Sequence, residues 1–309
     1  MDHEGTGRSA AGRLEAAVRR AVRTSRRHAR RLLAQMWVLP LRASNRWSRR
    51  PVTGDAPVAV SLTTYGARLA TVAWTIESIA WGVTRPQRLV LWLDEPAALA
   101  RPPRALRRLV RRGLEIRPTP DYGPHKKYYP YAASRSRHDL PLVTADDDVL
   151  YPPRWLLGLV AAHTERPDVV SCFRASVVAV AEGRLLPYDR WPRCTDTVTS
   201  ATRFATGVSG VVYPPSLLDE LARRGTAFQQ VAPRADDLWL HWVALQVGTP
   251  VRQVSARPRQ YAVVPGSQAT SLVVENLGAG GGNDQVVARL YDADDVARLA
   301  RAAREHGGR

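Results

Sequence analysis

The sequence predicts an α/β domain built on a mixed, mostly parallel sheet with helices on both faces. Short apolar runs rich in β-branched residues alternate with segments of helical spacing along most of the chain, a pattern typical of parallel sheets. Three runs of the first half end at polar residues, namely Thr63, Asp94 and Asp146. Because ligands bind at the carboxyl ends of such strands, these residues predict a site. With 309 residues, 45% of them hydrophobic, the chain can also bury a large core.

The first half of the domain is expected to contain four strands. They cover residues 58–63, 88–93, 114–117 and 142–145, each a short apolar run bounded by turn residues. Helices are expected between them, ending near Trp81, over 103–112 and around 126–135. Gly113 follows the second of these helices, in the position where glycine commonly ends one.

The second half is expected to continue the alternation. A helix is predicted over 153–164, a strand over 169–173, a hairpin from 177–180 and 184–186, and helices from Ser216 and over 235–245. Residues 278–285 are rich in glycine and predict a flexible loop before a polar C-terminal helix.

Most of the positive charge lies in the first fifty residues. The formal charge of the chain is +17, and residues 1–50 hold thirteen arginines against three acids, a net of +10 that leaves +7 for the other 259 residues. Apolar residues recur at helical spacing from about 11 to 37, and Pro40 is expected to end that helix. Residues 44–56 are interpreted as a linker. We therefore divide the chain into residues 1–56, a basic helix and linker, and residues 57–309, the α/β domain.

Three roles are open for the basic segment: docking on an anionic membrane surface through residues 11–50, a solvated tail, or nucleic-acid binding. Nucleic acid is not expected, because the segment lacks interleaved aromatics and any nucleic-acid-binding motif. We find no secretory signal and no run near the ~20 apolar residues that a spanning helix needs. Two cysteines cannot build a disulfide framework. A cytoplasmic protein is expected, possibly peripheral on the inner face of the plasma membrane.

The sequence Asp146-Asp147-Asp148 ends the fourth strand. Three adjacent carboxylates repel each other unless a counter-charge is present. Oxygen ligands of this kind suit Mg²⁺ or Mn²⁺, held by one or two carboxylates together with substrate phosphates. The alternative is a solvated acidic turn.

Lys126 and Lys127 are the only lysines of the chain and stand side by side upstream of the acidic strand end. A lysine there could neutralise the carboxylates or a diphosphate leaving group as a compact point charge. The alternative interpretation is the solvated start of a basic helix.

Asp236 and Asp237 begin a helix with an apolar face. One of them is explained by the preference of carboxylates for helix N-termini, and the other is then available as a general base. Gly207 and Gly210 lie in a small-residue loop that could let backbone approach a ligand, or form a simple turn.

Asn283 and Asp284 follow the glycine-rich stretch, where they could belong to a lid or to an ordinary loop. The scattered histidines do not show the spacing of a His-rich metal site. P-loop, nucleophile-elbow and dinucleotide fingerprints are missing from the sequence.

Taken in order, these motifs resemble a bacterial glycosyltransferase family of the GT-A fold, found in polysaccharide synthesis and related to family 2. The resemblance runs from about Val58 to Leu290. It is carried by the segments VSLTTY from 60, LWL from 91, KKY from 126, TADDDVLYP from 144, TGVSGVVYPP from 206, ADDLW from 235 and GND from 282. The Arg-rich N-terminus lies outside it.

The resemblance implies metal-dependent transfer of a sugar from a nucleotide-diphospho-sugar to a glycan or lipid-linked acceptor, with Mn²⁺ or Mg²⁺ as cofactor. It implies that Asp146 contacts the nucleotide or the metal and that Asp148 holds the metal, with Asp147 between these roles. It places Thr63, Thr64, Tyr65 and Asp94 around the nucleobase and ribose.

By the same resemblance, Asp236 or Asp237 is the base of an inverting enzyme, with Asp236 slightly preferred. Gly207, Gly210, Asn283 and Asp284 would then border the acceptor. Two other function classes stay open: a metal-dependent phosphotransferase or hydrolase that uses the acidic triplet, and a basic non-catalytic scaffold on membrane or nucleic acid.

Overall fold

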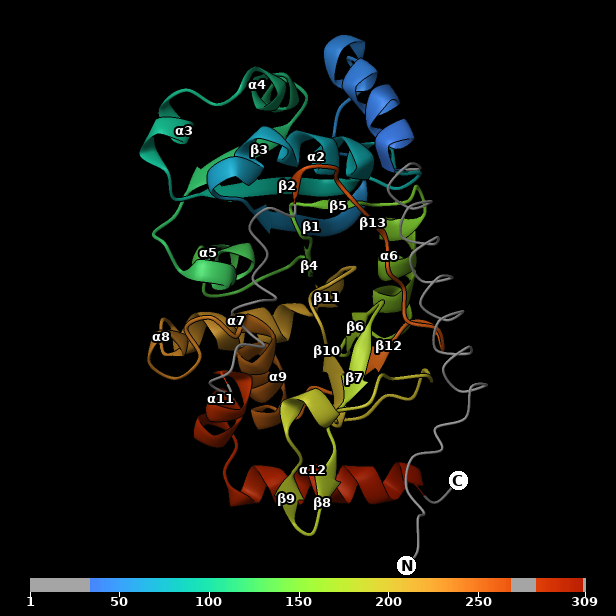
Figure 1. Ribbon diagram of the computed structural model, residues 1–309, viewed down its shortest axis with the longest axis vertical. Helices are drawn as coiled ribbons and strands as arrows, with labels where there is room; N and C mark the ends of the chain where they lie inside the picture. The colour runs from blue at the N-terminus through green and yellow to red at the C-terminus, as the bar shows by residue number, and fades with distance from the viewer. Residues whose placement is uncertain (1–33, 268–281, 308–309) are drawn as a thin grey trace, which may run out of the picture.

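The computed structural model describes residues 34–267 and 282–307, coloured along the chain in Figure 1. Its described part is an α/β structure around a seven-stranded sheet with the order β12-β6-β11-β4-β1-β2-β3. The strands are β1 (Ala56–Thr63), β2 (Pro86–Leu93), β3 (Leu114–Pro118), β4 (Leu142–Thr144), β6 (Val170–Cys172), β11 (Val211–Tyr213) and β12 (Val251–Gln253). The predicted α/β class is confirmed.

The sheet is mixed but mostly parallel. Strand β11 runs antiparallel to both of its neighbours, β4 and β6, and the other pairs are parallel. Its first half has the order β3-β2-β1-β4, so the direction in which strands are added reverses between β1 and β4. Such a reversal opens a crevice at the carboxyl ends of the strands, where α/β proteins bind ligands.

The strand register brings three predicted polar strand ends to one edge. Thr63 of β1 lies beside Trp92 of β2, and Ser61 beside Thr144 of β4. The chain therefore leaves β1, β2 and β4 at the same edge of the sheet, because parallel neighbours end together.

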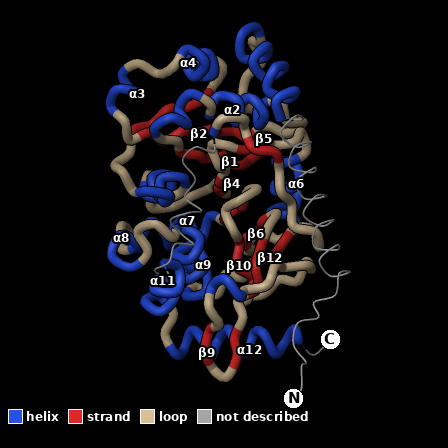
Figure 2. Tube along the Cα trace, in the orientation of Figure 1, coloured by secondary structure: helices blue, strands red, loops and turns tan. Residues whose placement is uncertain are grey.

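Two layers of helices cover the sheet (Figure 2). Alternate residues of β1 show the division: Val60 and Leu62 enter one apolar cluster and Ala59 the other, as the period of two in a strand requires. The first cluster contains α2 (Val72–Ala80), α4 (Arg104–Val110) and α6 (Trp155–Glu165), and the second α5 (Tyr129–Ala133), α7 (Pro215–Arg224) and α9 (Asp236–Gln246).

Shorter elements complete the described chain. Small two-stranded sheets pair β7 (Ala175–Val177) with β10 (Arg203–Ala205), β8 (Val180–Ala181) with β9 (Arg184–Leu185), and β5 (Val149–Leu150) with β13 (Ala262–Val263). The remaining helices are the 3₁₀ turns η1 (Gly66–Ala70), η2 (Gly123–Lys127) and η3 (Tyr188–Arg190), with α3 (Pro96–Ala100), α8 (Phe228–Val231), α11 (Gly282–Leu290) and α12 (Ala293–Gly307).

The N-terminal helix differs from its prediction. It is helical over the described residues 34–47 and continues through Pro40. A proline inside a helix removes a hydrogen bond and costs about 3 kcal/mol. Burial of Val38 and Leu41 against Leu150 and Val264 offsets that cost, at about 1.5–3 kcal/mol for each fully buried aliphatic side chain. Packing therefore overrides the helix-breaking signal.

Residues 44–47, interpreted from sequence as linker, belong to this helix and are fixed to the domain. Ser44 Oγ and Asn45 Nδ2 donate to the buried carboxylate of Glu77 at 3.0 and 2.9 Å, and Arg112 also pairs with it. Residues 1–33, which hold most of the predicted basic helix, lie outside the described residues, so the division of the chain at residue 56 stays a prediction. Within the described ranges, every helix is too short or too polar to cross a membrane.

A second difference concerns Asn283 and Asp284. The sequence predicts a flexible loop there, but residues 282–290 form α11. The first four residues of that predicted loop, 278–281, lie outside the described part of the chain. Val287 and Leu290 of α11 are buried in the core, and this burial stabilises a helix that the preceding glycines obscure in the sequence.

Candidate active site

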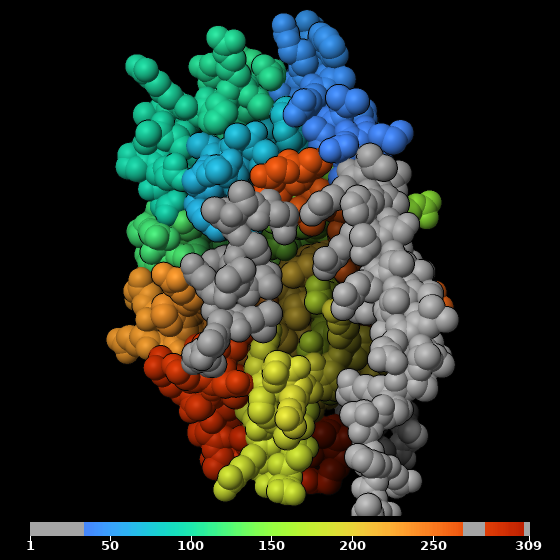
Figure 3. All heavy atoms as spheres, in the orientation of Figure 1, coloured from blue at the N-terminus to red at the C-terminus, as the bar shows by residue number. Residues whose placement is uncertain are grey.

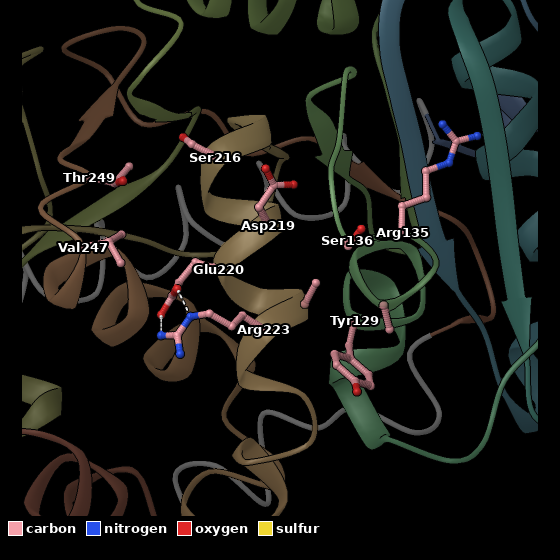
Figure 4. Close-up of a pocket in the computed structure, with 11 residues that line it drawn as sticks. Tyr129, Arg135, Ser136, Ser216, Asp219, Glu220, Arg223, Val247 and Thr249 are labelled. Atoms are coloured by element: carbon pink, nitrogen blue, oxygen red, sulfur yellow. Dashed lines mark hydrogen bonds and ion pairs between the residues drawn. The ribbon is translucent and has the colours of Figure 1, made fainter.

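One cavity of the described structure, about 860 Å³, does not contain the predicted site residues. It is a groove between α5 and α7 (Figure 4). Its carboxylates are already engaged, because Asp219 accepts from His138 and Glu220 from Arg223 and Arg224. We therefore do not place the site in this groove.

A second cavity of about 670 Å³ lies at the carboxyl ends of β1, β2 and β4, and we call it the strand-end cavity. It brings together seven residues predicted from the sequence. These are Thr63, Tyr65, Asp94, Lys126, Lys127, Asp146 and Asp147. They come from four separate segments of the chain, which meet through the strand order and, for the two lysines, through the path of η2.

The β2 end of the cavity holds a carboxylate fixed by a lysine. Lys126 Nζ lies 2.6 Å from Asp94 Oδ2 and 3.2 Å from Asp121 Oδ1, and Lys126 itself is buried. Asp94 Oδ1 is buried and has no hydrogen-bond partner among the described residues. An unsatisfied buried acceptor is costly, so this atom is suited to a donor group on a ligand.

Asp147 is held on two sides. Thr64 Oγ1 donates to its Oδ2 at 2.6 Å, and Arg68 Nη1 donates to its Oδ1 at 2.8 Å. Arg68 Nη2 also lies 3.3 Å from Asp148 Oδ2. Thr64 is thus buried behind the cavity and positions Asp147, while Asp148 pairs with Arg68 and is not among the residues that line the cavity.

Asp146 faces the cavity with little compensating charge. Its backbone N–H donates to the Tyr151 hydroxyl at 2.8 Å, which orients the residue, and the nearest cation, Lys127 Nζ, is 3.9 Å from Oδ1. Burial, together with the neighbouring carboxylates, raises the pKa of Asp146 to about 7. Placing a cation beside this carboxylate would stabilise its charged form.

The donor set suits a hard cation, because Asp146 and Asp147 offer only oxygen to the cavity. Within the described ranges, His, Cys, Asp and Glu side chains do not converge in a group of three or more that could hold a metal ion. A magnesium or manganese ion held by one or two carboxylates, with the rest of its ligands from substrate phosphates, fits this arrangement. A metal held by the protein alone does not.

The helix α9 adds the predicted acid pair behind Lys127. Lys127 Nζ lies 2.8 Å from Asp236 Oδ2. Asp237 Oδ2 accepts from the backbone N–H of Gly207 at 3.0 Å, while its Oδ1 is buried without a hydrogen-bond partner among the described residues. Asp146, Asp236 and Asp237 thus surround a single ammonium group.

The two acids of α9 differ in their charge state. Burial alone would raise the pKa of Asp236, but the Lys127 charge beside it lowers the pKa overall. Burial and the charge of Asp236 instead raise the pKa of Asp237 to about 6. Asp236 therefore serves as the counter-ion of Lys127, and Asp237 is a carboxylate that can take up a proton near neutral pH.

Glycine at 207 leaves room for two charged side chains. A Cβ at Gly207 would lie 2.8 Å from Lys127 Nζ and 3.0 Å from Asp237 Oδ1. At Gly210, where φ is +103°, a Cβ would collide with the Trp155 ring, whose indole N–H donates to the Ser209 carbonyl. This loop therefore lets backbone pass close to the acid pair, while its approach to a ligand stays a prediction.

Asn283 and Asp284 do not line the strand-end cavity. Asp284 Oδ1 accepts the backbone N–H of Tyr188 at 2.7 Å. Burial raises the pKa of Tyr188, and the charges of Asp237 and Asp236 add to the rise, so the ring lies within electrostatic reach of the acid pair. Asp284 thus reaches the site only through Tyr188.

Several lining residues were not predicted. Arg68 is the most important of them, and the others include Asp121, Tyr122, Phe228, Gln229 and Arg234. Arg68 lies in η1, 79 residues before the Asp147 that it contacts. Sequence offered one indirect signal, because three adjacent carboxylates require a counter-charge, but it did not say which arginine supplies it.

A scan of the sequence against known protein families gives no match, and a comparison with curated proteins gives none either. Among solved structures, 125 chains match. One of them is the crystal structure of GalNAc-T7 with UDP, GalNAc and Mn2+, with a TM-score of 0.46 and 13% identity over 82% of this chain and 54% of that chain. The match thus spans about half the length of that protein. A likeness at this level carries no residue roles from one protein to the other.

Proposed function

We propose that this protein is a GT-A-type glycosyltransferase that moves a sugar from a nucleotide-diphospho-sugar to a hydroxyl group of an acceptor. The observation that supports it best is the position of Asp146, Lys127 and Asp237 side by side at the switch point of the sheet. A cavity at that point suits a nucleotide, and a buried base beside it suits activation of a hydroxyl.

The outer part of the strand-end cavity would bind the nucleoside. Asp94 Oδ1 has an unused acceptor site and is held in place by Lys126. Tyr65 and Tyr122 line the same cavity and offer aromatic faces. A ribose hydroxyl or a base N–H would satisfy Asp94, and a planar base would cover apolar ring surface.

Asp146 and Asp147 would hold Mn²⁺ or Mg²⁺. Such an ion supplies charge neutralisation for the departing diphosphate. Asp148, predicted from the sequence as a ligand, is not among the residues that line the cavity, and because Arg68 pairs with both Asp147 and Asp148, a shift of Arg68 would open both carboxylates to the ion. Lys127 adds a fixed positive charge on the inner side of the same cavity.

Asp237 would be the general base. The bond from C1 of the sugar to the diphosphate oxygen breaks, the acceptor oxygen forms the new bond to C1, and the acceptor proton goes to Asp237 Oδ1. The leaving group is the nucleoside diphosphate. The acceptor attacks opposite the leaving group, so the configuration is inverted. Although the sequence slightly preferred Asp236, its ion pair with Lys127 leaves Asp237 as the better base.

The outer face of the N-terminal helix favours a peripheral position on an anionic membrane. Met36, Leu39 and Trp47 are 66%, 65% and 75% exposed. At 3.6 residues per turn they lie on the side opposite Val38 and Leu41, which pack on the domain. Residues 34–50 carry four arginines and no acid, a combination that suits an anionic bilayer interface. This helix stands at the edge of the molecule in Figure 3.

Co-sedimentation with vesicles tests this membrane contact. The triple change Met36→Ser, Leu39→Ser and Trp47→Ser should abolish binding to vesicles that contain phosphatidylglycerol. Val110→Ser with Val247→Ser, also exposed aliphatic positions, should leave it intact. If the wild-type protein, the triple variant and the double variant bind the vesicles equally, the proposed membrane contact is wrong. With this membrane contact, we propose a cytoplasmic enzyme at the inner membrane face that acts on a glycan or lipid-linked acceptor.

A thermal-shift screen of UDP-, GDP-, dTDP- and CDP-sugars with and without Mn²⁺ tests the activity. A ligand that binds the folded state raises Tm, so one nucleotide class should stabilise the protein with metal present, and Asp146→Ala should remove the effect. If no nucleotide sugar shifts Tm while a simple phosphate ester is turned over, the site is that of a phosphotransferase or hydrolase. If Asp148→Ala leaves function intact while deletion of residues 1–33, which spares the helix packed on the domain, abolishes it, the protein is a non-catalytic scaffold.

A further inference from the structure

Two arginines share one face of the small sheet next to the acid pair. Ser176 lies opposite Phe204 of β10 on one side and opposite Arg193 on the other. Residues opposite each other in antiparallel strands point to the same face, and so do residues two apart in one strand. The pairing continues one residue before β7, since the Thr206 backbone N–H donates to the Arg174 carbonyl, and Arg174, two residues before Ser176, therefore shares the face of Arg193.

This face adjoins the proposed base. The Thr206 backbone N–H and its hydroxyl both donate to the Arg174 carbonyl, at 3.1 and 3.2 Å. The next residue, Gly207, donates its N–H to Asp237. The side-chain charges also interact, because Arg174 lowers the pKa of Asp237 against the larger opposing effects of burial and Asp236.

Neither arginine has a partner of opposite charge in contact. Within the described residues, the Arg174 and Arg193 guanidiniums make no side-chain hydrogen bond or ion pair. Arg174 is half-buried, and burial together with the Arg193 charge lowers its pKa. Elsewhere a buried arginine is neutralised by contact, as Arg203 is by Asp196 at 2.8 Å. Two neighbouring guanidiniums without a contacting anion form a ready site for one.

Tyr188 completes the face. Its ring packs against Trp191 and Phe204, and its backbone is held by Asp284. The hydroxyl makes no hydrogen bond within the described residues. A tyrosine hydroxyl can donate to an oxygen of a sugar or of an anionic group.

We propose that Arg174, Arg193 and Tyr188 form an acceptor subsite that selects an acceptor bearing an anionic group, a phosphate or a carboxylate, close to the hydroxyl that is glycosylated. Its role as an acceptor site rests on the proposed function, whereas its binding of the anion does not. The anion pairs with the guanidiniums, and Asp237 meets the neighbouring hydroxyl.

Binding without any donor tests the subsite. Three probes are compared by calorimetry: an octyl glycoside, the same glycoside carrying a phosphate, and the corresponding octyl uronide. The wild-type protein should bind at least one charged probe more tightly than the neutral one by about tenfold or more, as expected of charge-assisted hydrogen bonds. The charged probe that gains more identifies phosphate or carboxylate as the natural group.

Matched variants decide which residues supply the preference. Arg174→Gln and Arg193→Gln should each remove most of it, and Arg111→Gln, at an exposed arginine directly after α4, should keep it. Arg174→Lys should recover part of it, since the charge returns without the planar fork. Equal binding of charged and neutral probes by wild type, or a preference that survives both Gln changes together, overturns the subsite. If the protein prefers the charged probes but binds no nucleotide sugar, the proposed function is wrong and the anion subsite stands.

Discussion

The strand-end cavity has an outer part, lined by Asp94 and Asp147, and an inner part at Lys127 and Asp146, behind which lie Asp236 and Asp237, two residues that do not line the cavity. The two parts treat their carboxylates differently. In the outer part each acid has a cation in contact: Asp94 has Lys126 at 2.6 Å and Asp147 has Arg68 at 2.8 Å. In the inner part, Asp146, Asp236 and Asp237 surround the single amine of Lys127. The outer pairs fix the shape of a binding surface. The inner group keeps negative charge that a cation, or a proton from an acceptor, can neutralise.

The largest predicted effect comes from removing the shared amine, which belongs to Lys127. Lys127→Met leaves the buried Asp236 without its ion-pair partner, and breaking a buried pair from one side costs about 3–5 kcal/mol. The free energy of unfolding, measured in urea, should fall by that amount and activity should disappear. A loss comparable to that of an exposed control such as Arg111→Gln would mean that Lys127 is not the counter-ion of the inner group.

A smaller change inside the inner part should affect activity without affecting the fold. Gly207→Ala places a Cβ against the mobile end of Lys127 and against Asp237. Both side chains can shift, so stability should change little, but a displacement near 1 Å at reacting groups can cost about 10²-fold in rate. We expect kcat to fall by that order with Tm nearly unchanged. Wild-type kcat in this variant would show that the close packing of residue 207 has no part in the reaction.

The charge balance of the inner part predicts a pH profile. Asp237 acts as a base only when it is deprotonated, so kcat should fall as the pH drops through about 6, its raised pKa. The charged groups that face it are Lys127, Asp236, Asp146 and Arg174. Arg174→Gln removes a positive charge that lowers the pKa, and the acid limb should therefore move to higher pH. If the acid limb of the kcat profile, measured with saturating substrates, does not move in Arg174→Gln, the charge of Arg174 does not lower the pKa of Asp237.

The weakest expected effect lies farthest from the cavity. Asp284→Ala removes one hydrogen bond to the Tyr188 backbone, which is worth about 0.5–1.5 kcal/mol. The KM for the acceptor should rise a few-fold while donor binding stays the same. Asp189→Ala, at an exposed position in the same turn, provides a control. An equal rise of the acceptor KM in Asp284→Ala and Asp189→Ala would mean that the hydrogen bond to Asp284 has no specific role in holding Tyr188.

The fold was accessible from the sequence because its signals are local. Strand ends at Thr63, Asp94 and Asp146 mark one edge of a parallel sheet, and the register confirms that they meet there. The prediction that Pro40 ends the N-terminal helix was wrong for the opposite reason. A local helix-breaking signal was outweighed by side chains that pack on residues more than a hundred positions away.

The site was accessible only in part. Lys126 and Lys127 stand out because the chain has no other lysine, yet their different partners, Asp94 and Asp236, depend on the path of η2 between two strand ends. Arg68 could not be chosen among so many arginines, because its contact with Asp147 joins distant segments. The two acids of α9 look alike in sequence and differ only through their neighbours.

Donor affinity and turnover measured together on two variants test the division of the cavity most directly. Asp94→Asn should weaken nucleotide-sugar binding and leave kcat nearly unchanged at saturation. Asp237→Asn should keep the donor Kd and lower kcat by about 10²–10⁴-fold, the usual contribution of a general base. If Asp237→Asn instead weakens donor binding as much as Asp94→Asn and retains kcat, the inner part binds the donor as the outer part does, and the proposed base does not exist.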